Sequence, residues 1–141
     1  MRRVSRRLVG LIGLMSFIVL IGPMGLVGCG GGVTPEQQAS LAAEGYYRHL
    51  AAGEVEQFLE GRAGADSLPE EYREQLVVGC RQFVAQQQRE HKGIRGVSTT
   101  NARMDTTLRQ MQVFLLLQYG DSTEEEIVVP MVEAAGRWRM K

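Results

Sequence analysis

Residues 108–119 read LRQMQVFLLLQY, and this stretch decides the fold of the chain. Its apolar residues Met111, Val113, Leu115, Leu117 and Tyr119 recur at every second position. A period of two is typical of a β-strand that buries one face, because successive side chains point to opposite sides of the backbone. The sequence therefore predicts a strand over 108–119 with a buried inner face.

Three further strands are predicted around this one. Residues 94–104 precede it, while residues 125–132 and 137–140 follow it. The connections contain the turn-forming residues Gly120-Asp121-Ser122 and Ala135-Gly136. Turns this short join neighbouring antiparallel strands, so the C-terminal half is predicted to be a meander of three to four strands.

The sequence pattern predicts three helices in the N-terminal half of the domain. Thr34, Pro35 and Gln37 form a capping box with proline at the first helical position, and the helix that they open extends to about Ala52. Its apolar stripe consists of Ala39, Ala43, Tyr46 and Leu50. A short second helix over 54–60 follows a glycine break.

The third helix is predicted over 70–91, opened by a second capping box that runs from Ser67 to Glu70. Its apolar stripe consists of Tyr72, Leu76, Cys80, Phe83 and Val84. We expect Cys80 to act as a small buried hydrophobe, because it lies on this apolar stripe in register with Leu76 and Phe83. The fold class is thus α+β, with three N-terminal helices packed on a curved antiparallel sheet.

Residues 1–28 are interpreted as a bacterial lipoprotein signal peptide. Four arginines lie in the first seven residues, and an apolar run follows over 8–22. Leu26-Val27-Gly28-Cys29 resembles the lipobox of bacterial lipoproteins, whose cysteine receives the lipid and becomes the first mature residue. The alternative is an uncleaved anchor helix, since the apolar run approaches the length of a membrane span.

This interpretation divides the chain into three parts. Residues 1–28 are the signal peptide, 29–33 are the lipidated Cys29 with a flexible glycine linker, and 34–141 form the domain. An acylated cysteine anchors the domain to the cell envelope, because two or more acyl chains hold a protein stably on a membrane. Gly30 stands where lipoproteins retained at the inner membrane often have aspartate, which favours the outer membrane, on its periplasmic side, if the host has two membranes.

Composition excludes some classes of function. Removing the four leader arginines from sixteen basic residues leaves twelve against sixteen acidic ones, a charge of about −4. An acidic domain is a poor nucleic-acid binder, because that affinity depends on cations that neutralise phosphates. No Cys/His cluster has metal-ligand spacing, so we predict neither a metal nor another cofactor.

The domain resembles the small nuclear transport factor 2-like (cystatin-like) lipoproteins of bacterial envelopes. The matching segments are Thr34-Pro35-Glu36, Tyr46-Tyr47, Ala51-Ala52-Gly53-Glu54, Met111–Tyr119 with Gly120-Asp121, and Gly136-Arg137-Trp138-Arg139-Met140. The resemblance implies a cone whose open end, between the helices and the concave sheet, holds a small ligand. Relatives that isomerise ketosteroids use an aspartate base, but no matching acid pair stands out here, so no catalytic residue is predicted.

Six residues are candidates for binding. Tyr47, Tyr72, Arg103 and Tyr119 carry polar tips that suit a pocket lining. Phe114 and Leu116 break the alternation of their strand by facing the side opposite the core. Either the curvature of the cone covers them, or they form an interface with a second copy or a partner.

Three functions remain open at this point. The leading expectation is a lipid-anchored, non-catalytic domain that binds a small ligand or another envelope protein. The second is a small enzyme that uses the cone in the manner of isomerases or dehydratases. The third is a structural accessory subunit that forms a homodimer.

Overall fold

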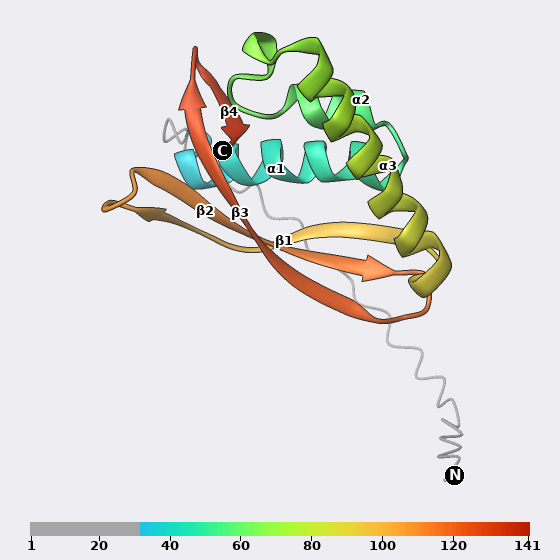
Figure 1. Ribbon diagram of the computed structural model, residues 1–141. Coiled ribbons are helices and arrows are strands. Elements are labelled where there is room, and N and C mark those ends of the chain that lie inside the picture. Colours follow the sequence, from blue (N-terminus) through green and yellow to red (C-terminus); the bar gives the residue numbers. More distant parts are fainter. Residues whose placement is uncertain (1–31) are drawn as a thin grey trace, which may run out of the picture. The chain divides into compact units, whose positions relative to one another are not determined.

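The computed structural model describes residues 32–141, so the predicted signal peptide and Cys29 lie outside the described residues. Four strands form one antiparallel sheet: β1 (Ile94–Asp105), β2 (Gln110–Tyr119), β3 (Glu124–Ala134) and β4 (Arg137–Met140). Their order in the sheet is β1-β2-β3-β4, which confirms the predicted meander (Figure 1). The fold class is α+β, as the sequence predicts.

Strand β2 supplies the centre of the core. All five residues of its predicted inner face are buried, and Met111, Val113 and Leu115 are fully inaccessible to solvent. The same face continues on β3, where Val129 pairs with Val113 and Met131 pairs with Met111. The alternation in 108–119 therefore correctly predicts which side of the sheet the helices cover.

Helix α1 (Pro35–Ala51) lies across this inner face (Figure 1). The predicted capping box is present: the Thr34 side chain accepts from the Gln37 N–H, and the Gln37 side chain accepts from the Thr34 N–H. Ala39 and Ala43 are fully buried against the sheet. Their small side chains let the helix backbone approach the large residues of β2.

Helix α2 (Val55–Glu60) and the short 3₁₀ helix η1 (Ala65–Ser67) lead to α3 (Glu70–His91). The predicted second capping box is wrong. Pro69 is the N-cap of α3 and no side chain caps this helix, because Ser67 belongs to the preceding 3₁₀ turn. Pro69 can hold the extended backbone of an N-cap without a capping side chain, since its ring fixes φ.

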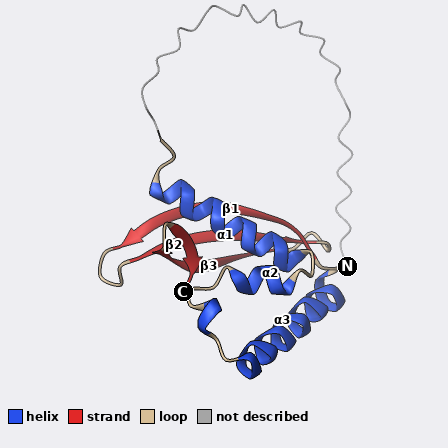
Figure 2. Cartoon of the chain, turned by 90° about the horizontal axis from the view of Figure 1, so that it is seen from above, coloured by secondary structure: helices blue, strands red, loops and turns tan. Residues whose placement is uncertain are grey.

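Helix α3 has 22 residues and none of them is buried. Seen from above, most of α3 lies to one side of the sheet, beyond α2 (Figure 2), while its C-terminal residue His91 is hydrogen-bonded to the turn after β2. Tyr72 and Phe83 keep 43% and 37% of their surface exposed. The expectation that the apolar stripe of α3 belongs to the core is therefore wrong, and Cys80 is only partly buried.

The core lies between α1 and the sheet. It consists of Ala39, Ala43, Val97, Met111, Val113, Leu115, Leu117, Tyr119, Val129, Met131, Trp138 and Met140. All of these residues belong to the compact unit Gly31–Lys141. This unit therefore contains the whole core that an independently folding domain of its size needs. Among residues 32–141, no helix combines the length and apolar character that crossing a membrane requires.

Candidate functional site

A cleft separates α3 from the edge of β3, and its walls are mostly apolar. It consists of two adjoining hollows of about 380 and 320 Å³, both lined by Tyr47, Phe58, Cys80 and Val128. Leu76 and Phe83 of α3 line one wall. We call this space the α3–β3 cleft; each hollow falls within the size range of small-ligand sites.

The stripe of α3 therefore faces an open space. An amphipathic helix normally buries its apolar side against another element, because this burial stabilises the helix in water. Here the positions Leu76, Cys80 and Phe83 border the cleft from one side, while Leu117 and Ile127 of the sheet border it from the other. The chain thus builds both walls of a pocket.

Two groups inside the cleft are able to donate a hydrogen bond. Burial raises the pKa of the Tyr47 hydroxyl, and the nearby Cys80 raises it further. Burial also raises the pKa of the Cys80 thiol, an effect that Arg62 partly offsets. Both groups therefore stay neutral and protonated near pH 7. The cleft can bind an uncharged, mainly apolar molecule without burying a charge.

The far end of the cleft has an acidic group. Glu125 lines the cleft and accepts a hydrogen bond of 2.7 Å from the Tyr119 hydroxyl. Burial, this hydrogen bond and the charge of Glu125 together raise the pKa of Tyr119 well above its usual value. Arg62 and Lys141 line the opposite end, so the cleft is negative at one end and positive at the other.

A cluster of polar side chains lies at the C-terminal end of α3. His91 Nδ1 lies 2.9 Å from Asp121 Oδ2, and the His91 ring stacks on Tyr119 with a centroid distance of 4.7 Å. Thr123 donates to Asp121 through both its backbone N–H and its hydroxyl. The hydrogen bonds from Thr123 and His91 lower the pKa of Asp121 to about 2. This arrangement ties the end of α3 to the turn between β2 and β3.

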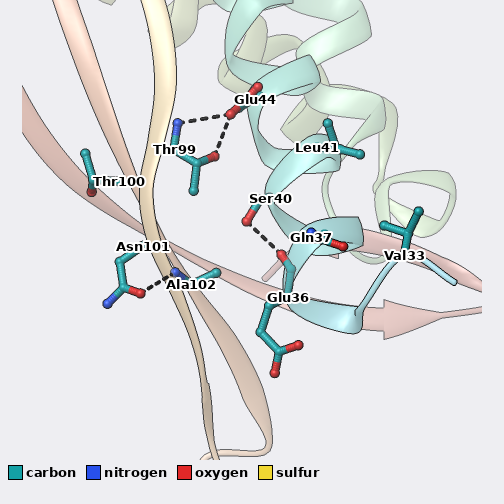
Figure 3. Close-up of a pocket in the computed structure, with 10 residues that line it drawn as sticks. All are labelled: Val33, Glu36, Gln37, Ser40, Leu41, Glu44, Thr99, Thr100, Asn101 and Ala102. Carbon is teal, nitrogen blue, oxygen red and sulfur yellow. Dashed lines mark hydrogen bonds between the residues drawn. The ribbon is translucent and has the colours of Figure 1, made fainter. Parts of the chain in front are cut away.

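A separate hollow of about 590 Å³ lies between the start of α1 and β1, and we call it the α1–β1 groove (Figure 3). Glu44 accepts from the Thr99 N–H at 3.0 Å and from the Thr99 hydroxyl at 2.6 Å. Val33 and Leu41 are 52% and 62% exposed at its rim. The groove is open to solvent and its best-placed carboxylate is occupied by Thr99, so it suits a specific small ligand less well than the cleft does.

The structure separates the four tyrosine and arginine residues predicted to line a pocket. Tyr47 lines the α3–β3 cleft. Tyr119 is buried beside the cleft, where its hydroxyl contacts Glu125. Tyr72 lies exposed near the start of α3, and Arg103 lies on the outer face of the sheet.

Arg103 is instead brought together with a residue of the predicted interface. Its guanidinium lies 5.3 Å from the centre of the Phe114 ring, which is a cation–π geometry. Phe114 and Leu116 are half-buried on the outer face, and the neighbouring Val128 is 51% exposed. Arg103 thus covers part of the outward aromatic ring that interrupts the alternation of β2.

Several lining residues were not predicted as site residues. Leu76 was assigned to the apolar stripe of the third helix, and no role was predicted for Phe58, Gly79 or Ile127. The sequence shows that Leu76 belongs to an apolar stripe. It does not show whether another element of the chain covers that stripe, so Leu76 could not be recognised as a pocket residue. Among residues 32–141, no group of three His, Cys, Asp or Glu side chains could hold a metal ion.

Comparisons with known proteins support the fold assignment. No protein-family model matches the chain, and no curated protein matches it significantly. A Campylobacter jejuni protein, provisionally named an NTF2-like (nuclear transport factor 2-like) transpeptidase, matches it in structure with a TM-score of 0.54. The match covers 70% of this chain and 92% of that one, at 12% sequence identity. The domain has the NTF2-like fold.

Assigning the NTF2-like fold leaves the activity open, because one fold hosts both binding proteins and enzymes. The chemistry must come from the site. The candidate site of this NTF2-like domain is the α3–β3 cleft, which lies between α3 and β3.

Proposed function

We propose that this chain is a lipid-anchored protein of the bacterial cell envelope whose domain is a non-catalytic binding module. The α3–β3 cleft takes an elongated, mainly apolar ligand. The observation that carries the proposal is the 22-residue α3, which has an apolar stripe and not one buried residue. A ligand or partner segment between this stripe and Leu117 and Ile127 would supply the missing burial.

The anchor is proposed from the sequence around Cys29 alone. Its test is metabolic labelling with palmitate followed by membrane fractionation, comparing the natural chain with Cys29→Ser. The natural chain should incorporate label and sediment with membranes, and the variant should do neither. Membrane association of the variant equal to that of the natural chain would support the uncleaved anchor helix instead.

The cleft is tested by filling it. Gly79 lines the larger hollow from α3, and a Cβ built on it meets nothing within 4 Å. Gly79→Leu should therefore direct its side chain into the space where the ligand binds, because its Cβ meets no other atom. Gly45 in α1 has the same free space but does not line the cleft, so Gly45→Leu is the matched control.

The readout is the fluorescence of the apolar dye N-phenyl-1-naphthylamine during titration of residues 31–141. We expect saturable binding to the natural domain, an affinity about tenfold lower or worse for Gly79→Leu, and no change for Gly45→Leu. Equal binding by all three proteins would show that the dye binds elsewhere.

Catalysis in the cleft is the second candidate, because a thiol lies there and the Campylobacter neighbour is provisionally named a transpeptidase. A cysteine nucleophile needs a lowered pKa, whereas burial raises that of Cys80. Isomerase or dehydratase chemistry needs a base, and the cleft's Glu125 is already bonded to Tyr119. We expect Cys80→Ala to keep full dye binding; a covalent acyl adduct trapped on Cys80 would establish the enzyme instead.

An accessory homodimer would use the outer face of the sheet. Phe114 and Leu116 are half-buried there, so a second copy could cover them. Light scattering of residues 31–141 with and without Phe114→Glu tests this alternative. A dimer that the variant dissociates would favour it over a monomeric binding module.

A further inference from the structure

One wall of the α3–β3 cleft is a strand edge. Within residues 32–141, β4 pairs with β3 only through Met131–Ala134, so the earlier part of β3 has a neighbouring strand on one side only. That part borders the cleft, because Val128, Val129 and Pro130 line the smaller hollow. The cleft therefore contains backbone groups as well as apolar side chains.

The direction of these backbone groups follows from one hydrogen bond and from the alternation of a β-strand. The Pro130 carbonyl accepts from the Lys141 N–H at 2.9 Å, so Pro130 directs its main chain away from β2. Residues two apart in a strand direct their N–H and C=O to the same side. Glu126 and Val128 therefore also direct their N–H and C=O away from β2, and Val128 borders the cleft. Proline at position 130 fits this geometry, since its missing N–H would face the edge.

The side chain of Val128 does not fill the cleft. Val128 pairs with Phe114, and the two share the outer face of the sheet. Its side chain is 51% exposed there, while the residue still lines both hollows. Val128 thus presents mainly its main chain to the cleft.

An aliphatic ligand would leave these N–H and C=O groups without partners, which costs free energy in an apolar site. An extended peptide satisfies them, because its own backbone donates and accepts at the same spacing. We infer that the cleft binds a short extended peptide segment that adds to the edge of β3 beside α3. This inference rests on the proposed function and names the class of its ligand.

The ends of the edge define what kind of peptide fits. Natural edge strands use charges and proline to prevent indiscriminate pairing, and β3 has Glu124–Glu126 at the start of its free edge and Pro130 at the end. Only a short segment can pair between them. Glu125 at one end and Arg62 with Lys141 at the other favour a peptide with a basic residue at one terminus and an acidic residue at the opposite one.

The probe is the fluorescein-labelled, capped hexapeptide Asp-Val-Thr-Val-Thr-Lys. In the more stable antiparallel pairing, its acidic end meets Arg62 and Lys141, and its basic end meets Glu125. Anisotropy titration of residues 31–141 should give saturable binding. Two further peptides carry N-methyl groups on the second and fourth or on the third and fifth residues. Only one of these sets faces β3, so one should lose binding and the other keep it.

On the protein side, Val128→Pro removes one edge N–H and changes no side chain inside the cleft. It should lower peptide affinity about tenfold, and by clearly more than Val128→Ala, which shortens the side chain but keeps the N–H. Proline is tolerated on an edge that faces away from the ladder, and circular dichroism verifies the fold. If Val128→Pro does not fold, the pair of methylated peptides decides.

The outcomes separate this inference from the proposed function. Binding of the dye without binding of the hexapeptide overturns the peptide inference and leaves an apolar small-molecule site. Peptide binding that neither Val128→Pro nor either methylated set weakens also overturns it. Binding of neither probe overturns the proposed function itself.

Discussion

Truncating Phe83 should cost little stability, although the pattern of α3 places it on the apolar stripe of a helix. In a packed core, Phe→Ala costs roughly 3–5 kcal/mol. Phe83 is 37% exposed and faces the α3–β3 cleft, so much of its surface has no protein partner to lose. Alanine also has a helix propensity several tenths of a kcal/mol better than that of phenylalanine. We expect Phe83→Ala to destabilise residues 31–141 by about 1 kcal/mol or less.

Leu115→Ala is the matched comparison, because Leu115 is fully buried at the centre of the core. It should cost about 2–5 kcal/mol through lost transfer free energy and the cavity left behind. Urea denaturation followed by circular dichroism measures both costs, with the slope m confirming that two-state unfolding is kept. A saturating cleft ligand should increase the cost of Phe83→Ala, since a ligand that binds only the folded state adds stability that the truncated site would lose.

If Phe83→Ala costs as much as Leu115→Ala without ligand, α3 packs against the sheet in solution and the cleft is closed. The apolar stripe would then be ordinary core, as its periodicity predicts, and no site would remain between α3 and β3.

Further predictions concern the helices and the β2–β3 turn. Gly79→Ala and Gly45→Ala should each stabilise the domain by roughly 0.5–1 kcal/mol in urea melts, because both have free space for a Cβ within a helix. Gly61→Ala should destabilise it by about 1–3 kcal/mol, since its Cβ would overlap the Tyr46 ring. Tyr46→Phe should cost about 0.5–1.5 kcal/mol in the same assay, because the Tyr46 hydroxyl donates to the Trp138 carbonyl at 2.8 Å. Asp121, with its pKa lowered to about 2, should contribute stability above about pH 4 that is lost as the pH falls toward 2; Asp121→Asn should remove this part of an acid titration.

Local sequence signals predicted most of the fold. The period of two in 108–119 correctly assigned the inner face of β2, because only one register buries all five apolar residues. The capping box at Thr34 and the turns after Tyr119 and Ala134 set the limits of α1, β2 and β3. These features depend on neighbouring residues, so the sequence contains the information that specifies them.

The misplaced features depend on contacts between distant parts of the chain. The stripe of α3 has the same period whether the sheet, a ligand or water faces it, so Cys80 and Phe83 could not be placed by pattern. The bulge of β1 between Thr99 and Asn101 shifts its register against β2. Arg103 of β1 lies over the ring of Phe114 in the neighbouring strand β2. The pairing of the two strands creates this contact, and the spacing of residues along the sequence does not predict it.

The central claim is that the α3–β3 cleft is the binding site of this domain. The most direct test is nuclear magnetic resonance of residues 31–141 saturated with N-phenyl-1-naphthylamine, recording intermolecular Overhauser contacts to assigned methyl groups. The account predicts contacts between the dye and the methyl groups of Leu76, Leu117 and Ile127, which line the cleft. Contacts confined to Val33 and Leu41 would place the site in the α1–β1 groove and contradict the account.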